Sequence, residues 1–154
     1  MGKWLEHTVT SKINAPVEQV WNVWSDLDAM PLWMTWIESV KTVDEETTKL
    51  PDLTEWTLAA NGFRFKWRAQ INERVDRQKL VWKSVGGLPT NGCVHFHYHP
   101  DQYTFVELKI SYELPAILAG FMKENILGGM VTNELQTNLD RFKGLVESGR
   151  GKIN

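Results

Sequence analysis

The segment from Ile13 to Val40 constrains the fold of this chain most, because it specifies four consecutive elements. Alternating residues that end at Ile13 predict the end of a strand. Pro16 suits the first turn of a helix, where a missing backbone N–H costs nothing, and we expect Asn14 to cap that helix. The apolar face of this helix has helical spacing: Val17, Val20, Trp21 and Trp24. Pro31 limits a second short helix, and a new strand follows.

The rest of the chain up to residue 114 has the pattern of an antiparallel sheet. The clearest strand runs from Phe63 to Arg74, where apolar residues alternate with basic and polar ones. One apolar face and one solvated face are typical of an antiparallel sheet that is wet on one side. Turn signals such as Asn61-Gly62 and the polar loop Asp44–Lys49 separate the strands. The predicted strands are Trp4–Ile13, Trp36–Val43, Thr54–Ala60, Phe63–Arg74, Lys79–Val85, Gly92–His99 and Tyr103–Leu114.

Pro115 ends the last strand, and the residues from Ala116 to Glu147 are predicted to form one long helix. Its apolar residues recur near one stripe, but Gly128-Gly129 interrupts them. Each glycine costs about 1 kcal/mol in a helix interior relative to alanine, so this pair predicts a kink or a thinner part of the helix. We expect residues 1–148 to form a single domain and residues 149–154 to form a flexible tail.

Composition excludes several classes of function. A net charge of −2 over 154 residues gives no sign of nucleic-acid binding. No apolar run is long enough for a membrane span, and the N-terminus does not resemble a signal peptide. The single Cys93 excludes an internal disulfide, which is compatible with a cytoplasmic location. Eight tryptophans in so small a chain instead indicate a wide aromatic interior.

The run I-N-A-P-V-E-Q-V-W-N-V-W-S-D, followed by P-L-W-M and a strand, resembles the opening of the START-like (SRPBCC) superfamily. More narrowly, it resembles the polyketide cyclase/dehydrase and lipid-transport group, which includes coenzyme Q-binding carriers. The resemblance implies an α+β helix-grip fold. In this fold a curved, seven-stranded antiparallel sheet wraps around a long C-terminal helix and a hydrophobic cavity, with two short helices between strands 1 and 2. Because the superfamily includes carriers, cyclases and hormone receptors, the resemblance does not select a function.

The residues themselves favour binding of a hydrophobic small molecule, such as a lipid, quinone, polyketide or pigment, between sheet and helix. Large side chains on the inward strand faces suit an apolar or planar ligand, although each of them could equally belong to a packed core. Trp21 and Trp24 are expected to pack the short helices onto the sheet. The predicted ligand-binding residues are Trp33, Trp56, Phe65, Trp67, Trp82, Phe96, Tyr98 and Met130.

The alternative is a polyketide cyclase/aromatase or a dehydratase that acts on a ligand in the same cavity. Its candidate catalytic groups are His7 and the phenols of Tyr98 and Tyr112. The alternation of its strand places His7 on the inward face. A satisfied core or rim histidine is the structural alternative for His7. No nucleophile motif, phosphate loop or dinucleotide fingerprint is present.

The remaining chemistry-bearing residues are assigned to the surface. His95, His97 and His99 share one strand face, but the apolar alternates occupy the inner side, so no metal site is predicted. Glu134 and Asn138 lie near the edge of the helix stripe, where they are either solvent-exposed or polar groups of the pocket. We therefore expect no cofactor, no metal and no nucleic-acid partner. A hydrophobic ligand is the expected partner, and transient contact with a membrane is compatible with the sequence.

Overall fold

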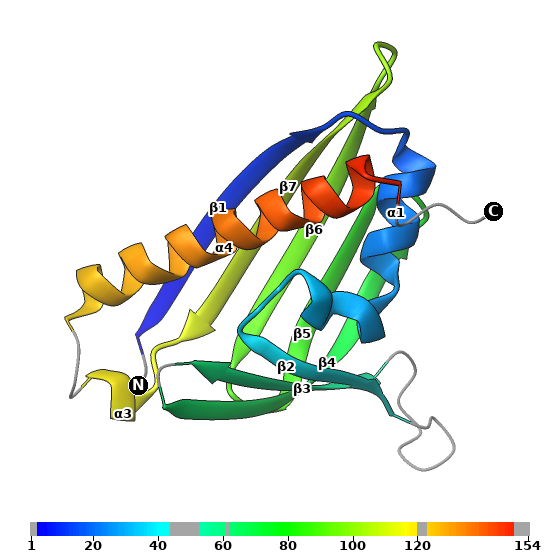
Figure 1. Cartoon of the computed structure of the whole chain (residues 1–154). Helices are drawn as coiled ribbons and strands as arrows, with labels where there is room; N and C mark the ends of the chain where they lie inside the picture. Colours follow the sequence, from blue (N-terminus) through cyan, green and yellow to red (C-terminus); the bar gives the residue numbers. More distant parts are fainter. Residues whose placement is uncertain (1–2, 44–52, 61, 120–122, 150–154) are drawn as a thin grey trace.

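The structure, a computed structural model, describes residues 3–43, 53–60, 62–119 and 123–149 (Figure 1). The predicted polar loop 44–49, Asn61 and the tail beyond residue 149 lie outside these residues. The elements are β1 (Trp4–Ile13), α1 (Val17–Ser25), η1 (Leu27–Leu32), β2 (Ile37–Thr42), β3 (Leu53–Ala60), β4 (Phe63–Val75), β5 (Lys79–Gly87), β6 (Thr90–His99), β7 (Tyr103–Glu113), α3 (Ala116–Ala119) and α4 (Glu124–Glu147).

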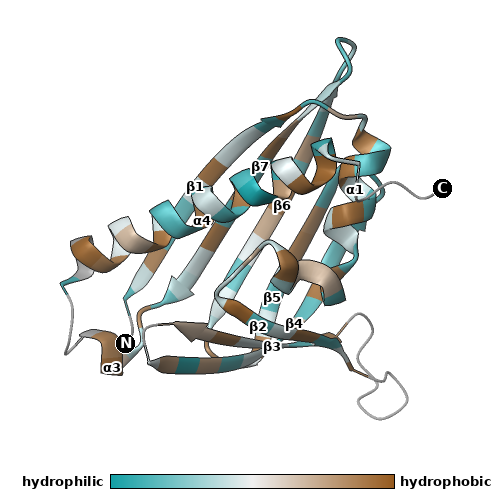
Figure 2. Ribbon diagram, viewed as in Figure 1, coloured by the Kyte–Doolittle hydropathy of each residue, from teal (hydrophilic) through white to brown (hydrophobic). Residues whose placement is uncertain are grey.

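The seven strands form one antiparallel sheet in the order β1-β7-β6-β5-β4-β3-β2. Figure 1 shows the sheet curling, so that β2 and β3 run across the end of the other strands and α4 lies over the concave side. Apolar and hydrophilic residues alternate along the strands, as Figure 2 shows, which gives the sheet one inner and one outer face. The predicted α+β helix-grip fold is confirmed.

Bulges contribute to the curvature, and one of them lies close to Gly87. The pairing of β4 with β5 shifts register between Arg68 and Ala69. Gly87 has a φ of 80°, and a Cβ there would lie 2.3 Å from the carbonyl oxygen of Lys66. That oxygen also accepts a hydrogen bond from the backbone N–H of Leu88 at 3.1 Å. Gly86 and Gly87, which lie beyond the predicted strand Lys79–Val85, therefore belong to β5, and Gly87 permits its close approach to β4.

The start of α1 differs from the prediction. The carbonyl of Pro16, the residue before the helix, accepts hydrogen bonds from the N–H groups of Gln19 and Val20. No side chain caps this end. Asn14 instead donates its backbone N–H to the carboxylate of Glu147 at 2.8 Å. The assignment of Asn14 as the cap is wrong, because this residue joins the strand end to the C-terminal helix.

The predicted single C-terminal helix is divided. Residues 116–119 form α3, and α4 begins only at Glu124, after Lys123 with an extended backbone (φ −65°, ψ 144°). Residues 120–122 lie outside the described residues. Gly128 and Gly129 lie within continuous α4, so the break precedes the glycine pair instead of coinciding with it.

Helix α4 is held along β1, which is an edge strand of the sheet. Gln136 donates to the carbonyl of Thr10 at 3.1 Å, and Lys143 donates to the carbonyl of Lys12 at 2.7 Å. The helix thereby satisfies backbone acceptors that an edge strand leaves unpaired. Within the described residues, no helix is both long and apolar enough to cross a bilayer.

The core where α1, η1 and α4 meet the sheet is aromatic. The rings of Trp24, Trp33 and Phe142 pack with centroids 4.8 to 5.1 Å apart, and Phe96 approaches Trp24 edge to face at 5.8 Å. Tilted and edge-to-face pairs of this kind are the favoured geometries of buried rings. This cluster fixes α4 above the sheet and so sets the depth of the space beneath the helix.

Candidate functional site: an apolar cavity beneath the C-terminal helix

A cavity of about 190 Å³ lies between α4 and the concave face of the sheet. A water needs roughly 10–15 Å³ on this measure, so the space suits a compact organic molecule. Its wall is almost wholly apolar, and no lysine, arginine or histidine is among the described residues that line it. The aromatic members of the wall are Trp24, Trp36, Trp56, Phe63, Phe65, Trp67, Trp82 and Tyr112.

Two stacked indoles form part of this wall. Trp56 on β3 and Trp67 on β4 are direct register partners, and their rings lie 5.9 Å apart and nearly parallel, at 9°. The Trp56 Nε1–H donates to Thr54 Oγ1 at 2.7 Å, and that hydroxyl donates to the carbonyl of Ala69 at 3.1 Å. The internal hydrogen bonds fix the ring of Trp56, so the pair presents a rigid surface to the cavity.

Most of the residues predicted to bind ligand line this cavity. Trp56 and Trp67 are joined there by Phe65, Trp82 and Met130. They come from three adjacent strands and from α4, which the curvature of the sheet brings to one space. The prediction that these residues bind a ligand stays a prediction, although their positions agree with it.

Three predicted site residues lie elsewhere. Trp33 is buried in the core cluster with Trp24 and Phe142, and it does not line the cavity. Phe96 is equally buried, because α1 covers its part of β6 and Trp21 packs on it edge to face. These two positions correct the expectation that both residues face the ligand.

Tyr98 is also misplaced by the prediction. It is 47% exposed near the β6–β7 turn, beyond the part of the sheet that the helices cover. Alternation along β6 directs its side chain inward, but the helices within the described residues leave it uncovered. Tyr98 therefore cannot join a site within the cavity, and the catalytic assignment loses one of its three residues.

His7 and Tyr112 do meet. His7 on β1 and Tyr112 on β7 stack with centroids 5.5 Å apart, and His7 Nε2 lies 3.1 Å from the Tyr112 hydroxyl. The other ring nitrogen, Nδ1, lies 2.9 Å from Thr132 Oγ1 on α4. Tyr112 lines the cavity, whereas His7 lies behind it. A histidine with both nitrogens engaged supports a specific orientation of the phenol.

Burial shifts both titrating groups toward their neutral forms. It lowers the pKa of His7 below its usual 6.5 and raises the pKa of Tyr112 to about 12. At neutral pH the pair is therefore an uncharged imidazole and an uncharged phenol. A neutral imidazole has one donor and one acceptor nitrogen, so one hydroxyl donates to it and the other accepts from it.

The cavity has a second polar position beneath the middle of α4. Asn138 is 1% exposed, and its Oδ1 lies 3.5 Å from the backbone N–H of Thr35 and 3.4 Å from the Thr35 hydroxyl. That hydroxyl donates at 2.7 Å to Glu134, which also lines the cavity. Asn138, expected to be solvent-exposed or a pocket group, thus belongs to the wall.

The outer face of β6 carries the three histidines. His95 and His97 stack with centroids 6.1 Å apart, while His97 and His99 are exposed. Among the described residues, no three histidine, cysteine or acidic side chains are placed to hold a metal ion. Burial raises the pKa of the Cys93 thiol, which disfavours a reactive thiolate.

Comparison with known proteins agrees with this architecture. Residues 13–135 match the family described as polyketide cyclase / dehydrase and lipid transport. The chain belongs to this family. Its resemblance to the START-like superfamily is thereby confirmed. An uncharacterised 17.2 kDa protein of Streptomyces lincolnensis is 26% identical over 137 residues, covering 88% of this chain and 85% of that protein.

Two solved structures of similar fold place the chain in its structural context. A START superfamily protein from Mycobacterium smegmatis has a TM-score of 0.75 at 12% identity, covering 93% of this chain and 97% of that one. The Zhui aromatase/cyclase of a Streptomyces species has a TM-score of 0.72 at 16% identity, covering 99% and 100%. At these identities the likeness concerns the fold alone.

The sequence analysis missed the roles of two residues, Trp24 and Thr132, and left the place of Asn138 open. Trp24 was assigned to packing, yet it also lines the cavity. Thr132 was not considered, and only the structure brings it to His7. Asn138 precedes Phe142 by four residues, so helical periodicity could have placed both on one face of α4.

Proposed function

We propose that this chain binds a small hydrophobic molecule in the cavity beneath α4 and carries or sequesters it. The observation that carries the proposal is the continuous apolar wall with its stacked indoles, Trp56 and Trp67. Burial of about 200 Å² of apolar ligand surface contributes about 5 kcal/mol before ordering costs. No charged group is needed for affinity of this kind, and the described lining supplies none that is basic.

Native mass spectrometry of the protein purified from its own host tests this function, and we expect a bound apolar molecule. A titration with the bicyclic hydrocarbon tetralin, followed by tryptophan fluorescence, supplies a defined probe. Trp67→Ala and Trp82→Ala should weaken tetralin binding while the circular dichroism spectrum is retained. Trp4→Ala is the matched control, because Trp4 is 46% exposed and lies outside the cavity wall. Equal binding by all four proteins would contradict the proposal.

The pair His7 and Tyr112 favours a second candidate function, a cyclase/aromatase or dehydratase acting on a ketone-bearing ligand in the same space. The phenol of Tyr112 is protonated and lines the cavity, so it can donate a hydrogen bond to a ligand carbonyl when His7 Nε2 is the donor within the pair. Such a contact polarises the carbonyl and acidifies the adjacent C–H, whose proton then passes to a base from the solvent.

Enolisation of a ketone in D₂O tests the catalytic candidate. We expect the protein to accelerate deuterium incorporation next to the carbonyl of 1-tetralone, and Tyr112→Phe to abolish the acceleration. His7→Gln should reduce it, since the phenol loses its oriented partner. A rate equal to the protein-free background would remove this candidate and leave the binding function standing.

A further inference from the structure

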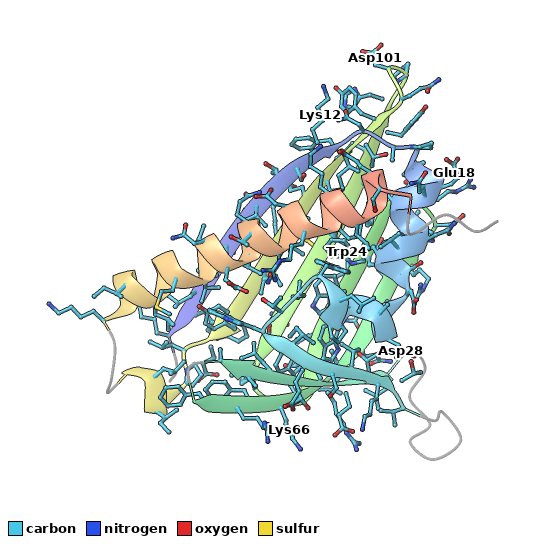
Figure 3. All side chains as sticks on the ribbon, viewed as in Figure 1. Lys12, Glu18, Trp24, Asp28, Lys66 and Asp101 are labelled. Atoms are coloured by element: carbon cyan, nitrogen blue, oxygen red, sulfur yellow. The ribbon has the colours of Figure 1, made fainter. Side chains whose placement is uncertain are left out.

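The apolar wall of the cavity contains a carboxylate. Among the described residues that line the cavity, Glu134 on α4 is the one that carries a charge. The charged side chains of Lys12, Glu18 and Lys66 instead point away from the body of the molecule, as Figure 3 shows, and all three residues are exposed. A charge beside an apolar space requires a compensating group, because the cavity cannot solvate it as water does.

The surroundings of Glu134 supply no positive charge. No lysine, arginine or histidine is among the described residues of the wall. Residues three and four positions away on a helix are those that pair with a charged side chain. For Glu134 these neighbours on α4 are all uncharged: Met130, Val131, Thr137 and Asn138. The carboxylate therefore makes this part of the cavity negative.

The hydrogen bonds around Glu134 leave acceptor oxygens undersupplied. The hydroxyl of Thr35 lies 2.7 Å from Glu134 Oε2 and 3.4 Å from Asn138 Oδ1, but it has only one proton to donate. The shorter distance assigns that proton to the carboxylate. Asn138 Oδ1 is then left with the backbone N–H of Thr35 at 3.5 Å, which is a long bond. A ligand group that donates several hydrogen bonds suits this position.

The position of these oxygens also suits a charged ligand group. Thr35 is exposed and Glu134 is half-buried, so this part of the wall adjoins the solvent. A cation placed here keeps part of its hydration, and the cost of burying it deep in an apolar cavity does not arise. The wall beyond it is rich in indole rings, whose π faces attract cations as well.

We propose that the ligand is a lipophilic amine, whose protonated nitrogen donates hydrogen bonds to Glu134 and Asn138 at the edge of the cavity. This inference rests on the proposed binding function and specifies the ligand within it. The apolar body lies against the stacked indoles of Trp56 and Trp67, which supply affinity. The carboxylate of Glu134 selects a cation over a neutral or anionic group, so this residue determines specificity.

Two probes with the same bicyclic body, 2-aminotetralin and 2-hydroxytetralin, test the inference. The amine is protonated at pH 7, as a lysine side chain is, whereas the alcohol is neutral. The measured quantity is the preference, defined as the Kd of 2-hydroxytetralin divided by the Kd of 2-aminotetralin, from calorimetry on the full chain. Glu134→Gln should lower the preference about threefold to tenfold, as expected for a partly solvated ion pair. Its amide oxygen still accepts from Thr35, so the circular dichroism spectrum should be retained.

Asp140→Asn is the control that separates a local contact from the overall charge. It removes the same charge from the same helix, but Asp140 is exposed, lies outside the cavity wall and bonds to Gln136 at 3.3 Å. We expect this variant to keep the wild-type preference. Equal preferences in Glu134→Gln and the wild-type protein would overturn the inference, as would an equal loss in Asp140→Asn. If tetralin binds without any preference for the amine, the inference fails and the binding function stands. If tetralin and both of these probes fail to bind, the binding function fails as well.

Discussion

The indole of Trp82 lies directly over Gly92, its register partner on the neighbouring strand. A Cβ at Gly92 would be 2.3 Å from a carbon of that ring, so any other residue requires the ring to move. Trp82 lines the cavity, and the absence of a side chain at Gly92 therefore sets how far the indole extends into it. A glycine that touches no ligand helps to define the shape of the site.

Gly92→Ala should displace the Trp82 ring. We expect the free energy of unfolding to fall by about 1–3 kcal/mol, the usual cost of overpacking, and tetralin affinity to change. Urea denaturation and the tetralin titration measure the two effects. If neither quantity changes, the contact between these residues does not position the ring.

Gly129→Ala is expected to have the opposite effect on stability. Gly129 lies inside α4, and a Cβ there meets nothing within 4 Å among the described residues. Replacing glycine in a helix interior removes backbone entropy from the unfolded chain, so the free energy of unfolding should rise by about 0.5–1 kcal/mol. Urea denaturation decides this, and a loss of stability would indicate that the glycine is needed for a contact.

His7 should make stability depend on pH below neutrality. Burial lowers the pKa of His7 in the folded protein below its usual 6.5, so in this range the unfolded state binds the extra proton. The contribution is fully present above pH 6.5 and is lost as pH falls through the folded pKa. We expect His7→Gln to flatten the pH profile of the unfolding free energy between pH 7.5 and 5, while parallel profiles would contradict this.

Tyr112 should make the stability of the fold depend on pH in the alkaline range. Its pKa is raised from 10 to about 12, so the unfolded chain ionises first and the free energy of unfolding should fall as pH rises between these values. A difference absorbance titration between the wild-type protein and Tyr112→Phe should show one phenol with a midpoint near 12. The variant also leaves His7 Nε2 without its partner, at a cost of about 1–3 kcal/mol. A midpoint near 10 would show that the phenol is solvated.

The strands could be predicted from sequence because alternation follows directly from strand geometry. Phe65 and Trp67 lie on the inner face as their phase indicates. Alternation shows on which face of a strand a side chain lies, but it does not show which other element covers that face. Phe96 lies under α1 whereas Tyr98 is 47% exposed, and only the path of the whole chain decides between those surroundings.

The polar parts of the site depend even more on tertiary structure. Thr132 and His7 are 125 residues apart in sequence, and no local pattern relates them. The division between α3 and α4 was missed for a related reason. Helix propensity alone does not exclude a helix through Lys123, whereas the structure gives this residue an extended backbone.

The placement of Trp24 has a consequence for how this family member can diversify. Its ring holds α1 and α4 together and also forms one end of the cavity. A mutation that changes ligand recognition at this end also changes the stability of the fold, so selection acts on both properties at once. The strand residues at the other end, such as Phe63 and Phe65, are only half-buried and have more freedom to vary. New ligands should therefore evolve through changes in the strands, with the Trp24 end kept as an inherited anchor.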